Sequence, residues 1–156
     1  MSKSGSWFIL YPDRPEITIA RAAEVLEGST VSVAVIGEDL LTVTTKGYTF
    51  DVALNRGAHV GHESREVADT LGKGRVDQEV IAAATARFEI GYEVSEGPAL
   101  FDALCDAQMA LTGLCDGIAA DIHNGRVMTP DLAFPRSSVD FDEDTLAATF
   151  ADIATL

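Results

Sequence analysis

Residues 87–94, Arg-Phe-Glu-Ile-Gly-Tyr-Glu-Val, decide the fold because their alternation is the clearest in the chain. Successive side chains of a β-strand point to opposite faces of the sheet, so every second residue shares a face. The apolar face would hold Phe88, Ile90, Tyr92 and Val94. The pattern predicts a strand that lays this face on a hydrophobic core and turns Glu89 and Glu93 to solvent.

The segment after this strand predicts a long helix followed by a hairpin. Pro98 is a favourable first residue for a helix, and apolar residues recur at helical spacing as far as Cys115. The expected core face of the helix holds Leu100, Phe101, Leu104, Leu111 and Leu114. Residues 117–122 then predict a strand, and Asn124-Gly125 is typical of a type I′ turn that leads back through residues 126–128.

The first third of the chain repeats this order of elements. Residues 7–11, Trp-Phe-Ile-Leu-Tyr, are continuously apolar and predict a strand that is buried on both faces. A helix is expected over residues 16–27, and strands are expected over 30–36, 40–45 and 48–54. The order strand, helix, strand, strand therefore occurs twice, without any repeat of the residues themselves.

We predict one α+β domain over residues 1–156, with a mixed or antiparallel sheet and the helices on one face. Two βαββ-like units would span residues 7–54 and 87–129. A helical connector is expected over 55–86, and an acidic tail with a short helix over 130–156.

The apolar segments are too short for a membrane span or a signal peptide. No apolar run reaches the roughly 18 residues that a membrane-spanning helix needs. Cys105 and Cys115 lie in one predicted helix, roughly 15 Å apart at 1.5 Å per residue, which is too far for a disulfide. We expect a cytoplasmic protein whose two cysteines are small buried residues rather than catalytic thiols.

Acidic residues are concentrated in the second half of the chain. The whole sequence has 25 acidic and 11 basic residues. Residues 86–156 hold 13 acids against three arginines, a net charge of −10, whereas residues 1–85 have a net charge of −4. Such a surface repels phosphate polymers and anionic lipids and attracts cations. We expect a basic protein domain as the partner and no binding to nucleic acid or membranes.

Six acids form the predicted partner-binding site. They are Asp102 and Asp106, one turn apart on the long helix, and Asp140, Asp142, Glu143 and Asp144 in the tail. Few bases lie near them in the sequence, so these carboxylates repel one another, and a basic partner would relieve that repulsion. In the alternative interpretation, the acids form a solvated surface that only keeps the protein soluble.

His59, His62 and Glu63 form a metal-like cluster in the sequence. Their side chains suit zinc or another transition metal. Their spacing differs from that of the helical zinc motifs, and Gly57 and Gly61 predict a loop that leads into a helix near Glu63. We expect no metal and no cofactor there.

Three segments of the second unit have a familiar layout. They are the strand 87–94, the helix start Glu96-Gly97-Pro98-Ala99-Leu100-Phe101-Asp102-Ala103-Leu104, and Gly117-Ile118-Ala119-Ala120-Asp121-Ile122-His123-Asn124-Gly125-Arg126-Val127. Together, over about residues 87–130, they resemble small acidic bacterial α+β proteins, including immunity proteins that neutralise polymorphic toxins. The resemblance assigns no functional residue. It implies a non-enzymatic inhibitor that masks the active site of a basic toxin.

Two other functions remain open at this point. A small metal-dependent enzyme would use His59, His62 and Glu63 as ligands. A structural or adaptor subunit would have no charge-dependent partner. Salt-dependent binding would favour the inhibitor, stoichiometric metal would favour the enzyme, and an apolar interface between copies would favour the adaptor.

Overall fold

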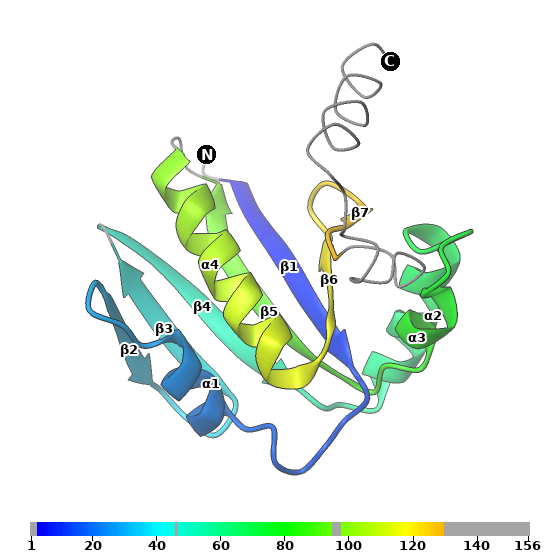
Figure 1. Ribbon diagram of the computed structural model, residues 1–156, viewed down its shortest axis with the longest axis horizontal. Helices are drawn as coiled ribbons and strands as arrows, with labels where there is room; N and C mark the ends of the chain where they lie inside the picture. The colour runs from blue at the N-terminus through cyan, green and yellow to red at the C-terminus, as the bar shows by residue number, and fades with distance from the viewer. Residues whose placement is uncertain (1–2, 46, 95–97, 130–156) are drawn as a thin grey trace, which may run out of the picture.

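The computed structural model describes residues 3–45, 47–94 and 98–129 (Figure 1). The strands are β1 (Lys3–Tyr11), β2 (Val31–Val35), β3 (Leu40–Thr45), β4 (Tyr48–Asn55), β5 (Ala86–Val94), β6 (Ile118–Asp121) and β7 (Arg126–Val127). The helices are α1 (Ile19–Leu26), α2 (His59–Thr70), α3 (Gln78–Ala82) and α4 (Pro98–Cys115). The predicted α+β class is confirmed.

The seven strands form one sheet in the order β2-β3-β4-β5-β1-β6-β7, and all the pairings are antiparallel. β1 lies between β5 and β6, where Trp7 pairs with Ile90 on one side and with Asp121 on the other. The two predicted units therefore interleave, since the first strand of one is inserted into the other. Helices α2 and α3 lie between β4 and β5 in the chain.

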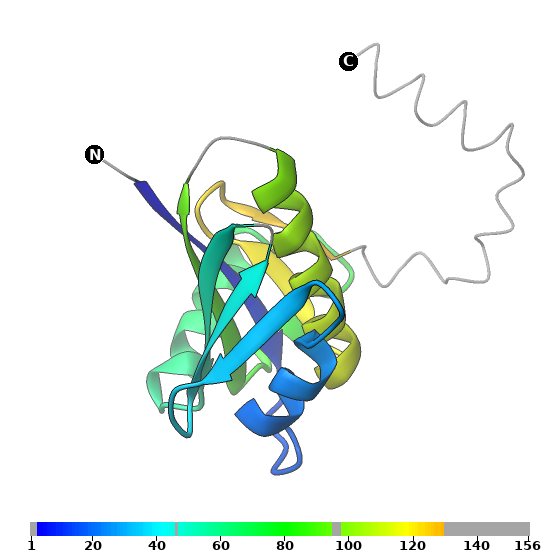
Figure 2. The ribbon, with the colours of Figure 1, turned by 90° about the vertical axis from the view of Figure 1, so that its left-hand side faces the viewer.

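The main hydrophobic core lies on the face of the sheet that α1 and α4 cover. Trp7, Ile9 and Tyr11 of β1 point to this face and are at most 2% exposed. They pack with Phe88 and Ile90 of β5 and with the apolar sides of α1 and α4. Figure 2 shows α1 and α4 together on this side of the sheet. The predicted apolar face of residues 87–94 is thus confirmed for Phe88 and Ile90, and Tyr92 packs against the same core.

The second face of the sheet is also covered at one end, which differs from the prediction of helices on one face. Phe8 and Leu10 of β1 point to this side and pack with Ala68 of α2, with Ile81 of α3 and with Ile118. The reason lies in residues 7–11: because they are apolar on both faces, they need a layer on each side. The connector between the two units supplies the second layer.

Helix α4 has the predicted bounds, but its buried face is narrower than expected. Leu100, Leu104 and Leu111 are at most 6% exposed, whereas Phe101 is 49% exposed. Phe101 lies one position around the helix from the buried stripe, and its ring reaches only the edge of Trp7, at 5.9 Å between centroids. It is therefore a surface residue with one aromatic neighbour.

The turn after β6 differs from the predicted type I′ turn. Asp121 pairs with Arg126, so four residues form the loop, and Gly125 has a φ of 68° whereas Asn124 does not have a positive φ. The Asp121 carboxylate accepts hydrogen bonds from the backbone N–H of Asn124 at 3.0 Å and from its side-chain amide at 2.7 Å. This side-chain turn replaces the two-residue hairpin.

Within the described residues, no helix is long and apolar enough to cross a membrane.

We predict that Leu104→Ala lowers the free energy of unfolding by about 2–5 kcal/mol, because Leu104 is 2% exposed and its removal leaves a cavity. The control is Met109→Ala on the exposed side of the same helix, which should change that free energy by less than about 0.5 kcal/mol. Urea unfolding measures both variants. If the two losses were equally small, Leu104 would not belong to the core and the packing of α4 would be wrong.

Candidate partner-binding site on helix α4

Asp102 and Asp106 lie one turn apart on the outward side of α4, and both are exposed. Within the described part of the chain, neither carboxylate has a hydrogen bond or an ion pair. Some other acids have a basic partner, as Asp13 has in Arg56 and Glu63 has in Arg87, whereas Glu38 and Asp39 in the turn between β2 and β3 have none among the described residues. The outward side of α4 therefore presents two negative charges that no side chain of the described residues pairs with.

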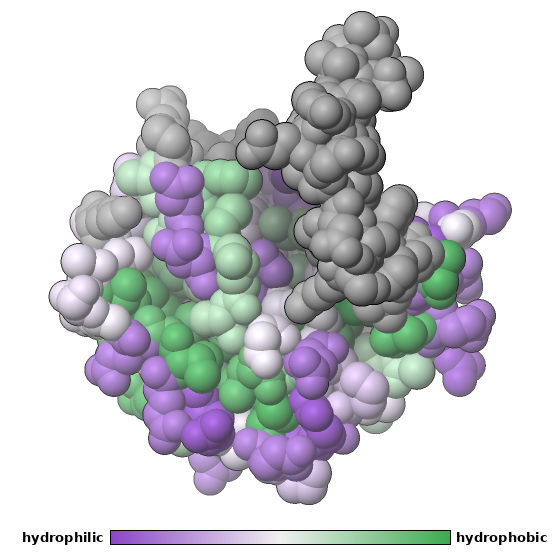
Figure 3. All heavy atoms as spheres, in the orientation of Figure 1, coloured by the Kyte–Doolittle hydropathy of each residue, from purple (hydrophilic) through white to green (hydrophobic). Residues whose placement is uncertain are grey.

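Two large apolar side chains accompany these acids. Phe101 is 49% exposed and Met109 is 67% exposed. We call Phe101, Asp102, Cys105, Asp106 and Met109 the α4 face. Figure 3 shows hydrophilic and apolar side chains side by side along α4. Exposed aromatic and methionine side chains are enriched in protein interfaces, so the α4 face has an interface-like composition.

A groove of about 190 Å³ runs between the end of α1 and α4, above β2, β3 and β4. Val25 and Leu26 of α1 form one wall, and Phe50 and Val43 form part of the floor. On α4 the lining consists of Ala103, Asp106, Ala107 and Ala110. The three alanines lie four and three residues apart, so they share a face of the helix and leave room beside α1. We call this cavity the α1–α4 groove.

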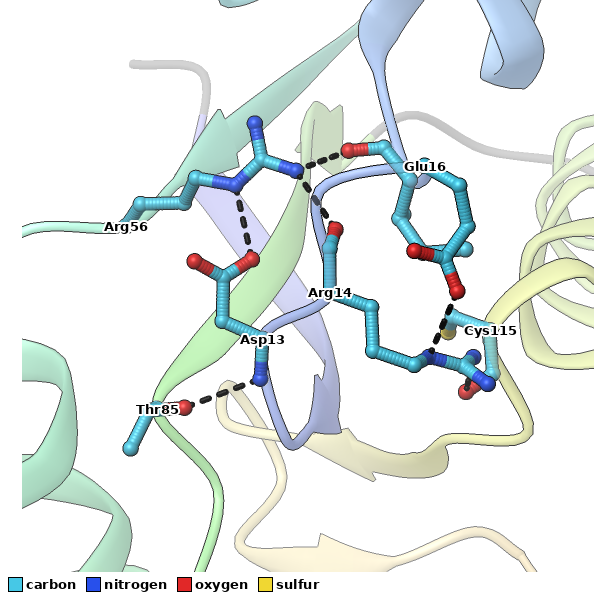
Figure 4. Close-up of polar contacts among 7 residues, drawn as sticks. Asp13, Arg14, Glu16, Arg56, Thr85 and Cys115 are labelled. Atoms are coloured by element: carbon cyan, nitrogen blue, oxygen red, sulfur yellow. Dashed lines mark hydrogen bonds and ion pairs between the residues drawn. The ribbon is translucent and has the colours of Figure 1, made fainter.

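The C-terminal end of α4 is held by an arginine (Figure 4). Arg14, in the loop between β1 and α1, donates a hydrogen bond to the carbonyl oxygen of Cys115 at 2.8 Å. Cys115 is the last residue of α4, where carbonyl groups lack partners within the helix and a positive charge is favourable. Arg14 therefore satisfies one end of α4 and ties it to the loop that leads into α1.

A second arginine fixes the same loop from the other side. Arg56, which follows β4, donates to the Asp13 carboxylate at 2.8 Å and to the carbonyl oxygens of Arg14 and Ile17. Asp13 also donates its backbone N–H to the Thr85 hydroxyl at 2.9 Å. We call Arg14 and Arg56 the arginine clasp. The clasp therefore ties the loop before α1 both to the last residue of α4 and to the residue that follows β4.

The structure places the six predicted acids in two groups. Asp102 and Asp106 belong to the α4 face, and Asp106 also lines the groove. The other four, Asp140, Asp142, Glu143 and Asp144, lie outside the described residues. The sequence argument missed Phe101 and Met109, because a helical apolar pattern alone does not separate a core residue from one at the edge of the stripe. The alanine spacing on α4 was the available signal for the groove.

His59, His62 and Glu63 are helical, which corrects the predicted loop. α2 begins at His59, because Val60 is fully buried and anchors the first turn in spite of Gly61. The three side chains point to different partners. His59 contacts the Asn55 amide at 3.0 Å, and His62 contacts Glu66 at 3.3 Å.

Glu63 has a structural partner in the second layer. It pairs at 2.8 Å with Arg87, whose side chain is 6% exposed and also donates to Glu89 at 2.6 Å. The Arg87 guanidinium lies 4.0 Å from the centre of the Phe8 ring. Glu63 and Glu89 thus neutralise a buried charge, so Glu89 is not on a freely solvated face as predicted. Among the described residues, no three His, Cys, Asp or Glu side chains are grouped as a metal site would need.

The two thiols are free and disfavour ionisation. Burial raises the pKa of Cys115 to about 12, and its Sγ donates to the Leu111 carbonyl oxygen at 3.1 Å. The pKa of Cys105 is raised by partial burial and then by the charges of Asp102 and Asp106. Both thiols are therefore protonated at neutral pH, whereas a cysteine nucleophile reacts as the deprotonated thiolate.

The comparison with protein-family models finds no match, and the searches of curated proteins and of solved structures find none either. The similarity to immunity proteins therefore remains a prediction from the sequence. The functional argument depends on the geometry of the α4 face and the α1–α4 groove.

We predict that Arg56→Ala lowers the free energy of unfolding by about 1–3 kcal/mol, because the Asp13 carboxylate and two loop carbonyls lose a charged donor. Arg21→Ala is the matched control, since its ion pair with Glu24 is exposed and should contribute less than about 0.5 kcal/mol. Urea unfolding followed by tryptophan fluorescence measures both variants. Equal losses would mean that the clasp does not fix the loop.

Proposed function

We propose that this protein is a non-enzymatic inhibitor that binds a basic protein domain through the α4 face, as an immunity protein binds its toxin. The observation that carries the proposal is the pair of exposed carboxylates at Asp102 and Asp106, which have no counter-ion among the described residues. They lie beside Phe101 and Met109, which are largely exposed.

Electrostatics favours a basic partner for this surface. The whole chain carries a net charge of −14, so a cationic domain is attracted before contact and a second acidic protein is repelled. A toxin that acts on nucleic acids or nucleotides presents a basic cleft, because its substrate carries phosphates. The two carboxylates of α4 would occupy positions that substrate phosphates otherwise take.

Apolar contacts would stabilise the complex once it has formed. Charges on an exposed surface speed association more than they strengthen the final complex. Phe101 and Met109 offer the aromatic and flexible apolar contacts that protein interfaces favour. The proposal therefore assigns steering to Asp102 and Asp106, and packing to Phe101 and Met109.

The other titratable groups support a binding role more than catalysis. Glu63 and Glu89 pair with Arg87, and the two thiols have raised pKa values. His59 and His62 point to separate partners on α2 and β4. None of these arrangements joins a nucleophile to a base that could activate it.

The proposal expects a gene beside this one to encode a basic domain, and the test uses that domain. We expect expression of that domain to arrest the growth of a bacterial host, and co-expression of this chain to restore growth. The double variant Asp102→Asn/Asp106→Asn should require about tenfold more inhibitor for the same rescue, because association slows. Glu38→Gln/Asp39→Asn, in the exposed turn between β2 and β3, removes the same charge and should rescue like the wild type.

Two outcomes contradict the proposal. If the wild-type chain leaves the growth arrest unchanged, it is not an inhibitor of that domain. If both double variants rescue equally well, net charge rather than the α4 face governs the interaction.

A further inference from the structure

The α1–α4 groove is too small for a cofactor but large enough for one side chain. Pockets that hold small-molecule ligands usually measure about 300–1,000 Å³. The groove measures about 190 Å³ and is open to solvent along one side. In protein interfaces, cavities of this kind receive a single anchoring residue of the partner.

The lining of the groove combines apolar walls with three polar side chains, those of Thr30, Thr45 and Asp106. Val25, Phe50 and Ala107 present hydrocarbon along its length. Thr45 lines it as well, is 5% exposed, and its hydroxyl has no hydrogen bond among the described residues. Asp106 adds a carboxylate that also lacks a counter-ion there. The Thr45 hydroxyl and the Asp106 carboxylate can both accept hydrogen bonds, so this lining is suited to an occupant that carries donors.

We propose that the groove receives one arginine or lysine side chain of the basic partner. The aliphatic stem lies against Val25, Phe50 and Ala107, and the charged end donates hydrogen bonds to the Asp106 carboxylate and the Thr45 hydroxyl. This inference rests on the proposed function, because it names the residue type by which the partner is recognised. In this arrangement Asp106 contacts the partner directly. Asp102 does not line the groove and attracts the partner only through long-range electrostatics.

Other occupants fit the lining less well. A purely apolar side chain would cover Asp106 and Thr45 without giving either a hydrogen bond, which is costly for a carboxylate. A second copy of this chain would bring another net charge of −14 to the same surface. A long basic side chain matches both the hydrocarbon walls and the acceptors, since lysine and arginine carry an apolar stem and several donors.

The test uses n-butylguanidinium, which reproduces an arginine side chain, and N-butylurea, which has nearly the same shape and no charge. Each is titrated into the full chain at about 150 mM salt, close to physiological ionic strength. Backbone amide chemical shifts in two-dimensional NMR report the binding. We expect butylguanidinium to shift the amides of Thr45, Ala103 and Ala107, with a dissociation constant on the order of a few millimolar. Butylurea should bind at least about threefold more weakly.

Three variants locate the contact. Asp106→Asn should weaken butylguanidinium binding by about three- to fivefold, as expected for one exposed charge pair. Thr45→Val keeps the shape of the side chain, removes the hydroxyl and should weaken binding by about twofold or more. Asp102→Asn is the matched control, because it removes an equal charge one turn away, outside the groove, and should change binding by less than about twofold.

Equal weakening by Asp102→Asn and Asp106→Asn, or shifts spread over all acidic segments, would overturn the groove contact in favour of a diffuse ionic attraction. Equal binding of butylurea would identify an apolar occupant and overturn it as well. Shifts in the groove that depend on protein concentration alone would indicate a second copy.

Growth rescue distinguishes the two proposals. If Asp106→Asn rescues like the wild type and the probe does not bind, the groove contact fails and the inhibitor remains.

Discussion

The burial of β1 on both faces is the constraint on which the rest of the structure depends. Trp7, Ile9 and Tyr11 face α1 and α4, whereas Phe8 and Leu10 face α2 and α3. The same strand pairs with β5 on one side and with β6 on the other. Each layer of the molecule therefore contacts one nine-residue strand. A polar side chain at these positions would leave a buried group without a partner and would loosen two layers at once.

Helix α4 has a definite outward face because its inward face and its end are fixed. Leu104 and Leu111 are buried on the sheet, and Arg14 holds the carbonyl oxygen of Cys115. Arg56 ties the loop before α1 to the end of β4. Packing and the clasp thus determine which α4 residues meet solvent. Asp102, Asp106 and Met109 do so on a rigid element, which limits the entropy that binding would cost.

Much of the fold could be predicted from local patterns, while the relative positions of its parts could not. The strand at residues 87–94, its core face at Phe88 and Ile90, and the helix from Pro98 to Cys115 were predicted correctly, because burial on one face leaves a periodic signal. The insertion of β1 between β5 and β6 depends on long-range pairing, which has no local signal. The candidate site divides in the same way. The exposure of Asp102 and Asp106 followed from helical periodicity, but the groove required the position of α1, and the start of α2 at His59 depended on the burial of Val60.

The central claim is that the acids of α4 face the partner. The most direct test is the association rate with the basic domain that the proposal expects as the partner, measured by stopped-flow fluorescence as ionic strength rises. The account predicts that Asp102→Asn/Asp106→Asn slows association by about tenfold at low salt, and that the difference from the wild type shrinks as salt screens the charges. The comparison variant converts Asp140, Asp142, Glu143 and Asp144 to their amides. If that variant alone slowed association, while the α4 variant kept the wild-type rate at every salt concentration, the partner would contact the tail and the account would be contradicted.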